Sequence, residues 1–263
     1  MKIALVQVTT TGDKERNIEI VAPRIREAAR NGATLIVLPE ATMQAFDQGR
    51  LDTQAEELDG TFATSMRSLA QELGVTIVAG MFRPADSNGE NNRVYNTALV
   101  TGPDVHKGYD KIHTYDVADY KESETVKPGS EMMTFVHEGA VVGVAICFDI
   151  RYPEQFKDLA RLGAEVIVVP TSWADGEGKL EQWRTLTAAR ALDAGVFIVA
   201  TDQARPGGKD NAGTPSGPTG IGHSVVVGPT GQRLAEAGYE EDILYAEVDP
   251  AEVAEARKAM QLL

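Results

Sequence analysis

Runs of consecutive apolar residues alternate along the chain with segments in which apolar residues recur every three or four positions. The continuous runs predict buried strands, and the periodic segments predict amphipathic helices. In the N-terminal half the expected strands are residues 2–8, 34–40, 75–82 and 94–100. The helices expected between them are residues 17–30 and 60–73, the second of which is closed by Gly74. This order predicts a sheet covered by helices.

The C-terminal half repeats this order of elements. Its expected strands are residues 141–146, 165–171, 196–201 and 223–229, and its expected helices are residues 154–162 and 180–192. The second strand of each half runs into a proline, Pro39 or Pro170. Two similar halves close most simply as two sheets packed face to face with helices outside. We therefore predict an α/β fold, a four-layer αββα sandwich of two pseudo-symmetric halves, in a single domain of residues 1–263.

Other segments stand outside this repeat. Residues 109–130 are polar and residues 205–222 are crowded with glycine, proline, serine and asparagine, so both are expected to be loops. The second lacks the glycine-lysine pattern of a phosphate-binding loop, which favours a solvated surface loop, and a role as a lid stays open. Asp249-Pro250 is typical of a helix start and predicts a final helix through Met260. The apolar Leu262-Leu263 end suits a contact with another subunit.

Charge and cysteine content narrow the classes of function. The chain carries 39 acidic and 25 basic side chains, a net charge of −14. Such a charge repels phosphate backbones and anionic membranes, so nucleic-acid and membrane partners are disfavoured. The chain has one cysteine and four scattered histidines, which form neither an internal disulfide nor a zinc-type cluster. We expect a cytoplasmic protein without a metal site.

The single cysteine stands where chemistry is expected. Cys147 follows the apolar strand at residues 141–146 and precedes Pro153-Glu154, a favoured helix start. A thiol placed there is expected to be exposed at the sheet edge and close to the positive end of a helix, which favours the thiolate. Taken alone, however, a lone cysteine after an apolar strand is more often a small core residue. Other residues must decide between these interpretations.

A carboxylate and a lysine complement the thiol. Glu40 ends a strand of the first half, and the carboxyl ends of parallel strands are where α/β proteins assemble their sites, so Glu40 is expected to meet Cys147. Alone, Glu40 and Lys111 are each more simply solvated charges. Together the three residue types supply a base, a cation and a nucleophile for acyl transfer. His113 and His137 are interpreted as loop residues, so a Cys–His pair has weak support.

Three motifs in this order resemble those of the nitrilase superfamily of carbon-nitrogen hydrolases. They are Leu38-Pro39-Glu40, Tyr109-Asp110-Lys111-Ile112-His113 and the run from Cys147 to Glu154, Cys-Phe-Asp-Ile-Arg-Tyr-Pro-Glu. The resemblance covers essentially the whole chain and implies the αββα fold. It implies that Glu40 is the general base, Cys147 the nucleophile and Lys111 the stabiliser of the tetrahedral intermediate. The segment Tyr120-Lys121-Glu122-Ser123 resembles one that carries a further family glutamate, which makes Glu122 its counterpart.

The resemblance also implies a reaction. Cys147 would attack an amide carbonyl, Lys111 and the backbone N–H of Phe148 would hold the oxyanion, and ammonia would leave. Water activated by Glu40 and positioned by Glu122 would then hydrolyse the thioester, without a metal or organic cofactor. The Cys147 motif is more similar to amidases acting on short dicarboxylate monoamides or on deaminated glutathione than to the Cys-Trp-Glu motif of true nitrilases. A homodimer or larger homo-oligomer is implied as well.

Substrate-binding candidates flank these motifs. Arg151 is expected chiefly to pair with Glu154 and brace the helix start, while binding of a substrate carboxylate by Arg151 or Arg205 is the alternative. Trp173 follows an expected strand end and is a candidate for the pocket wall, whereas Trp183 on a helix is expected in the core or a subunit interface.

Other functions remain open at this point. They are an N-carbamoyl amidohydrolase or a nitrilase using the same three residues, and a binding or redox-sensing protein of the same fold.

Overall fold

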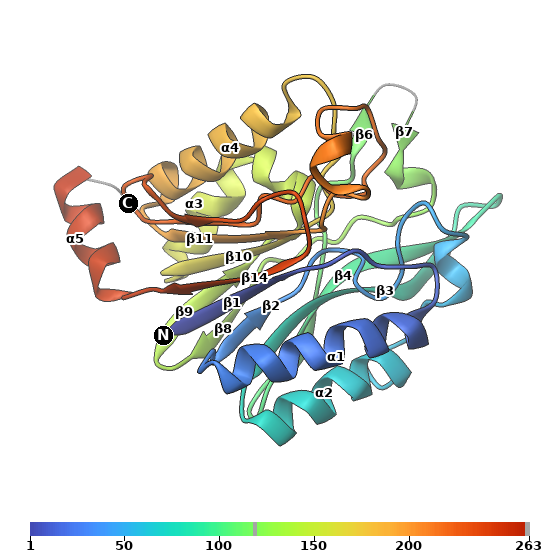
Figure 1. The fold of residues 1–263 in the computed structure, drawn as a ribbon, viewed down its shortest axis with the longest axis horizontal. Helices are drawn as coiled ribbons and strands as arrows, with labels where there is room; N and C mark the ends of the chain where they lie inside the picture. The colour runs from blue at the N-terminus through green and yellow to red at the C-terminus, as the bar shows by residue number, and fades with distance from the viewer. Residues whose placement is uncertain (118–119, 261–263) are drawn as a thin grey trace.

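The computed structural model describes residues 1–117 and 120–260, and it shows two six-stranded sheets packed face to face (Figure 1). Helices α1 (Lys14–Arg30) and α2 (Thr61–Leu73) cover the outer face of one sheet, and α3 (Pro153–Arg161) and α4 (Lys179–Ala194) cover that of the other. The predicted αββα sandwich is therefore confirmed.

The first sheet has the strand order β14-β1-β2-β3-β4-β5. Strands β1, β2 and β3 are parallel, and β4, β5 and β14 run antiparallel to their neighbours. The bounds are β1 (Lys2–Gln7), β2 (Leu35–Val37), β3 (Thr76–Ser87), β4 (Asn92–Thr101), β5 (His106–Asp110) and β14 (Asp242–Glu247).

The second sheet has the order β13-β12-β11-β10-β9-β8. Its bounds are β8 (Met133–His137), β9 (Ala140–Val144), β10 (Val166–Thr171), β11 (Phe197–Asp202), β12 (Val225–Val227) and β13 (Arg233–Glu236). Strands β9 to β13 follow one another as β1 to β5 do, and in each sheet one further strand, β14 or β8, pairs antiparallel with the first. The internal repeat read from the sequence is thus present in the topology.

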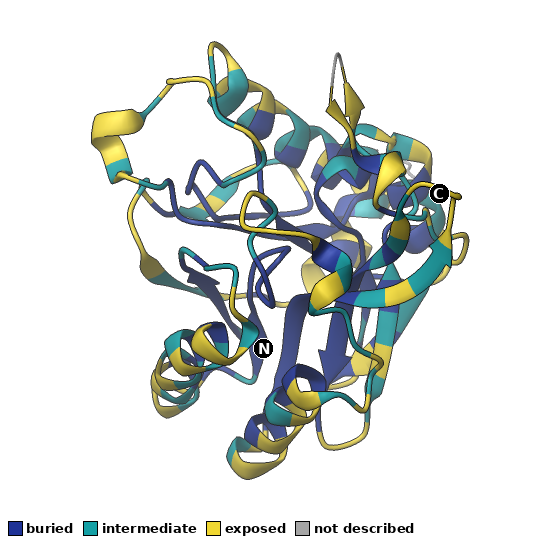
Figure 2. Ribbon diagram, turned by 90° about the vertical axis from the view of Figure 1, so that its right-hand side faces the viewer, coloured by how far each residue is buried: buried dark blue, intermediate teal, exposed yellow. Residues whose placement is uncertain are grey.

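The continuous apolar runs are explained by burial on both faces of each sheet. In β1, Ile3 and Leu5 belong to the core that the two sheets share, whereas Ala4 and Val6 belong to the core beneath α1 and α2. Successive strand residues point to opposite faces, so both sets must be apolar. Figure 2 shows the same result as buried strands flanked by helices with one exposed side.

Two predictions about the middle of the chain were wrong. Residues 109–130 are not all loop, because β5 ends in them and they contain β6 (Asp116–Val117), β7 (Tyr120–Lys121) and the 3-10 helix η2 (Glu122–Glu124). His137 is not a loop residue either, since it ends β8, where its imidazole contacts the hydroxyls of Thr34 and Thr76 at 3.1 Å each. Strands of two residues carry no periodicity, and edge strands such as β8 are partly polar, so neither gives a clear pattern.

The C-terminal part follows the prediction as far as the structure describes it. Helix α5 (Ala251–Met260) begins directly after Asp249-Pro250. Leu262-Leu263, expected at a subunit contact, lie outside the described residues. None of the described helices combines the length and apolarity needed to span a membrane.

Candidate active site

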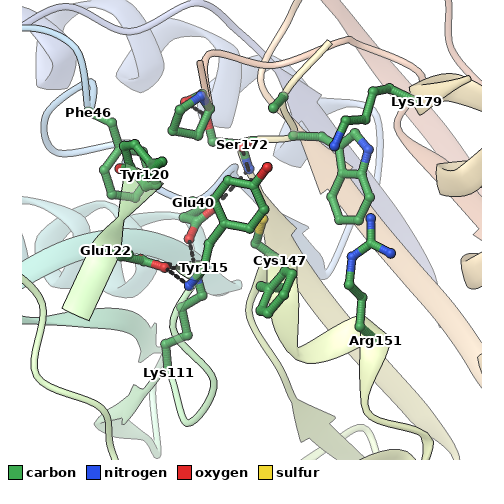
Figure 3. Close-up of a pocket in the computed structure, with 14 residues that line it drawn as sticks. Glu40, Phe46, Lys111, Tyr115, Tyr120, Glu122, Cys147, Arg151, Ser172 and Lys179 are labelled. Atoms are coloured by element: carbon green, nitrogen blue, oxygen red, sulfur yellow. Dashed lines mark hydrogen bonds and ion pairs between the residues drawn. The ribbon is translucent and has the colours of Figure 1, made fainter. Parts of the chain in front are cut away.

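A cavity of about 400 Å³ is lined by residues that follow strands of both sheets (Figure 3). The residues predicted from the sequence to act in catalysis or substrate binding line it, except the alternative carboxylate binder Arg205. The residues that line it are Glu40, Lys111, Glu122, Cys147, Phe148, Arg151 and Trp173. The fold therefore brings them together, while the role of each stays a prediction.

Cys147 stands at a sharp turn after β9. It is the first residue of the 3-10 helix η3 (Cys147–Arg151) and has a φ of 43°, in the left-handed region that side chains rarely adopt. The turn is fastened by Asp149, whose carboxylate accepts hydrogen bonds from the Ile146 N–H at 2.9 Å and the Tyr109 hydroxyl at 2.7 Å. Such strain persists only where surrounding contacts impose it, and it directs the thiol into the cavity.

The thiol of Cys147 is buried rather than exposed. Its Sγ lies 4.0 Å from the Ser172 carbonyl oxygen, to which it donates, and only 7% of the residue is accessible. Burial raises the pKa of Cys147 well above its ordinary value, the Glu40 carboxylate raises it further, and Lys111 opposes them. The expectation of an exposed, thiolate-favouring cysteine was therefore wrong, because one short 3-10 turn cannot outweigh burial beside a carboxylate. This thiol needs a base.

Glu40, Lys111 and Glu122 form a buried charge cluster. The Lys111 Nζ donates to Glu40 Oε1 at 3.0 Å and to both carboxylate oxygens of Glu122 at 3.0 Å, and each residue is at most 3% exposed. Burial alone would lower the pKa of Lys111, but the two carboxylates outweigh it and raise that pKa well above its ordinary range. Burial and the nearby Glu122 raise the pKa of Glu40, against the opposing effect of Lys111. The cluster thus holds a permanent cation beside a carboxylate able to accept a proton.

Two further groups hold Glu40, and sequence reasoning missed both. The Asn96 side-chain NH₂ donates to Glu40 Oε1 at 2.7 Å and to Glu122 Oε1 at 3.2 Å. The backbone N–H of Ser172 donates to Glu40 Oε2 at 2.9 Å. An amide inside a strand that was expected to be buried, at residues 94–100, was the available signal for Asn96, because buried polar side chains need a partner.

The backbone of Glu40 is placed by a close approach to β3. The Gly80 N–H donates to the Pro39 carbonyl at 3.1 Å. A Cβ at Gly80 would lie 2.4 Å from the Ala41 nitrogen and 2.7 Å from the carbonyl carbon of Glu40. Only glycine therefore allows the segment after β2 to rest on β3 in this way.

Two cations line the side of the pocket away from Lys111 and Glu122 (Figure 3). The Arg151 guanidinium donates to Gln182 Oε1 at 2.8 Å, and its central carbon lies 5.1 Å from the centroid of the Trp173 ring. The expected pairing with Glu154 is therefore replaced by pocket contacts. Lys179 is the second cation, which no motif indicated; its Nζ lies 6.0 Å from the Tyr115 ring centroid.

Arg205 and Trp183 do not reach the pocket. Arg205 is 7% exposed and donates from Nε to Asp175 Oδ2 at 2.8 Å, so it fastens the loop at residues 205–222 to the segment after β10. That loop nevertheless contributes Pro218 to the pocket wall. Trp183 is fully buried in the core, which was one of the two positions expected for it.

In the described ranges, 1–117 and 120–260, no group of three or more His, Cys, Asp or Glu side chains is arranged to hold a metal ion.

Comparison with known proteins identifies the family. The sequence pattern of carbon-nitrogen hydrolases matches residues 2–258. The chain belongs to the carbon-nitrogen hydrolase family. The resemblance to the nitrilase superfamily is thereby confirmed, and the chain is a hydrolase of carbon–nitrogen bonds.

Individual relatives of this carbon-nitrogen hydrolase agree with that assignment. A Mycobacterium tuberculosis protein named hydrolase Rv0480c is 42% identical over 271 residues, covering 100% of this chain and 94% of the relative. Human omega-amidase NIT2 is 31% identical, covering 98% and 91%. The amidase of Nesterenkonia sp. AN1, a nitrilase-superfamily protein, is 25% identical with a TM-score of 0.78, covering 99% and 95%. A mutant of that amidase carries the acetamide moiety of fluoroacetamide on its active-site cysteine.

Proposed function

We propose that this carbon-nitrogen hydrolase is a cysteine-dependent amidase that cleaves a small amide to a carboxylic acid and ammonia through a thioester on Cys147. The observation that carries this proposal is the meeting of a buried thiol with the Glu40–Lys111–Glu122 cluster in one cavity. The covalent adduct on the active-site cysteine of the Nesterenkonia amidase supports the same role for Cys147.

The first half-reaction forms the thioester. Glu40 takes the thiol proton as the sulfur of Cys147 bonds to the amide carbon. The carbonyl oxygen gains negative charge, which the Lys111 ammonium and the Phe148 N–H stabilise, because the N–H groups of a helix's first turn lack helical partners. The carbon–nitrogen bond then breaks, and the nitrogen leaves as ammonia with the proton that Glu40 held.

The second half-reaction releases the acid. Glu40 takes a proton from water, the water oxygen bonds to the acyl carbon, and the carbon–sulfur bond breaks. The sulfur recovers its proton from Glu40, so the enzyme returns to its starting state. Glu122 is 3.0 Å from the Lys111 Nζ through each oxygen, and we assign it the role of holding that cation and the water in place.

The two outer cations indicate the substrate class. Arg151 and Lys179 line the same cavity of about 400 Å³ as Cys147, on the side away from the charge cluster (Figure 3). A small amide that carries a carboxylate at its other end would place the amide on Cys147 and the anion on these cations. The relatives named omega-amidase support this class over neutral nitriles and N-carbamoyl compounds.

A substrate panel tests the proposal. The protein is incubated with ω-amides, N-carbamoyl compounds and nitriles, ammonia is followed, and intact mass is recorded after brief exposure. We expect release from ω-amides, no release by Cys147→Ala, and a larger acyl adduct in Glu122→Gln than in the unchanged protein. If no compound releases ammonia, the amidase proposal is wrong, and a binding or redox-sensing function remains. Full activity of Glu40→Gln together with loss in His113→Ala would assign the base to His113.

We further infer a cytoplasmic homodimer or larger homo-oligomer in which residues 1–263 act as one hydrolase domain. The unpaired Cys147 thiol suits a reducing compartment. Light scattering on the purified protein measures the assembly, and a monomer would contradict it.

A further inference from the structure

A second cavity adjoins the active-site pocket. It has a volume of about 420 Å³, and three of its wall residues, Phe46, Ser172 and Pro218, also line the active-site pocket. Its remaining wall comes from the segments directly after β1 and β11 and from two loops. These residues are Thr9, Thr10, Ala45, Asp47, Gln48, Gln203, Pro206 and Thr219. Because Gln48 is exposed and Thr10 is buried, the cavity leads from the surface into the interior.

The inner end of this second cavity rests on Glu40. Gln203 donates from Nε2 to the Glu40 carbonyl oxygen at 3.0 Å and to Thr10 Oγ1 at 2.8 Å. Ser172 separates the two cavities, and its N–H donates to Glu40 Oε2 at 2.9 Å. Its hydroxyl donates to the Pro218 carbonyl at 2.6 Å, which ties the wall to the loop at residues 205–222. Ser172 therefore borders both cavities and contacts the Glu40 carboxylate directly.

The two cavities differ in character. Aromatic rings line the active-site pocket, among them those of Phe148, Trp173 and Tyr115. Hydroxyl and amide side chains line much of the second cavity, including those of Thr10 and Gln203. Polar walls that offer several hydrogen-bond partners hold water, whereas an aromatic pocket suits the acyl chain of a substrate.

We propose that the second cavity is the route by which the hydrolytic water reaches Glu40 while the acyl group occupies the active-site pocket. The inference rests on the thioester proposed above. With the acyl chain attached to Cys147 and lying against the aromatic rings, the open side of the active-site pocket is occupied, and water approaches the thioester from another side. It enters past Gln48 and Thr10 and crosses the shared wall of Phe46, Ser172 and Pro218, on whose other side Glu40 lies. There Glu40 takes one of its protons, its oxygen bonds to the acyl carbon, the carbon–sulfur bond breaks, and the sulfur is reprotonated.

Bulky substitutions from two separate walls test this route. Thr9→Trp is expected to fill the cavity from the segment after β1, and Thr219→Trp from the loop; neither residue lines the active-site pocket. Thr214→Trp is the matched control, because Thr214 is exposed in the same loop and lines neither cavity. Each variant is assayed with an ω-amide that the unchanged protein hydrolyses. The first-turnover rate of ammonia release, kcat and the fraction of acyl-enzyme by intact mass are measured.

Both plugged variants are expected to keep the first-turnover rate within about twofold, to lose at least about tenfold in kcat and to accumulate acyl-enzyme. The control is expected to match the unchanged protein. Unchanged kcat in both plugged variants would overturn the proposal, as would a loss confined to Thr219→Trp or shared by Thr214→Trp, which would report distortion of the loop. Failure of the unchanged protein to release ammonia or form an adduct would instead refute the amidase function.

Discussion

The side-chain NH₂ of Asn96 donates to Glu40 Oε1 at 2.7 Å, and the same group donates to Glu122 Oε1 at 3.2 Å. One amide from β4 therefore holds two carboxylates that lie far apart in the sequence. The side-chain Oδ1 of Asn96 is buried and has no hydrogen-bond partner among the described residues. Asn96 is a positioning residue in this arrangement, since it acts on the reaction through the two glutamates.

Asn96→Ala is expected to weaken the base in two ways. Loss of the hydrogen bond frees Glu40 to move, and a displacement of about 1 Å can cost about 100-fold in rate. The same hydrogen bond lowers the pKa of Glu40, so its removal raises that pKa further. Because Glu40 must be ionised to accept the thiol proton, the acid limb of kcat/KM shifts to higher pH. The pH profile of kcat/KM measures both effects.

The control for this experiment is Asn92→Ala, at an exposed position at the start of the same strand. It is expected to leave the profile unchanged. A fall in the activity of Asn96→Ala with no displacement of the acid limb would mean that Asn96 supports only the fold.

Gly80→Ala is expected to displace the Glu40 carboxylate by pushing on the backbone of Glu40 and Ala41. The added methyl group would lie 2.4 Å from the Ala41 nitrogen, where no flexible side chain can yield. Overpacking of this kind costs about 1–3 kcal/mol in stability, and we expect kcat/KM to fall about 100-fold as Glu40 moves. Gly217→Ala, where an added Cβ meets nothing within 4 Å, serves as the matched control. Wild-type kcat/KM in Gly80→Ala would contradict the assigned role of this contact.

Arg151→Gln and Lys179→Gln test recognition of an anionic substrate end. A hydrogen bond to a charged group contributes about 1.5–3 kcal/mol, so each change is expected to lower kcat/KM for a carboxylate-bearing amide by about 10–100-fold. The neutral amide of the same length lacks the anion and is expected to change by no more than about threefold. Arg161→Gln, on the exposed side of α3, is the control. Equal losses for both amides would show that the cations support the pocket walls instead.

His137 is expected to make the fold sensitive to acid. Burial lowers the pKa of His137 below its ordinary value of 6.5. Between the lowered pKa and about 6.5 the unfolded chain binds more protons than the folded one, so the free energy of unfolding falls as the pH drops through this window. His137→Gln is expected to reduce that slope, which urea unfolding at several pH values measures. Identical slopes in the two proteins would exclude His137 as a source of the acid sensitivity.

Much of the fold could be predicted from the pattern of apolar residues along the sequence. The apolar runs predicted most strands, because strands buried on both faces must be apolar at every position. The repeated order predicted the paired halves, and strand ends predicted where Glu40 and Cys147 lie. The polar edge strands β8, β13 and β14 were missed, since one exposed face removes the continuous apolar signal.

The sequence by itself determined which chemical groups are present, the order of the elements and the short segments after β2 and β9 in which Glu40 and Cys147 lie. Only the tertiary structure decided the state of those groups. Whether Cys147 is a thiol depends on its burial beside Glu40, and whether Lys111 is a solvated charge or the centre of a cluster depends on Glu122. The protonation states of these groups depend on the distances between charges and on the exclusion of water. Both arise only when segments far apart in the chain meet.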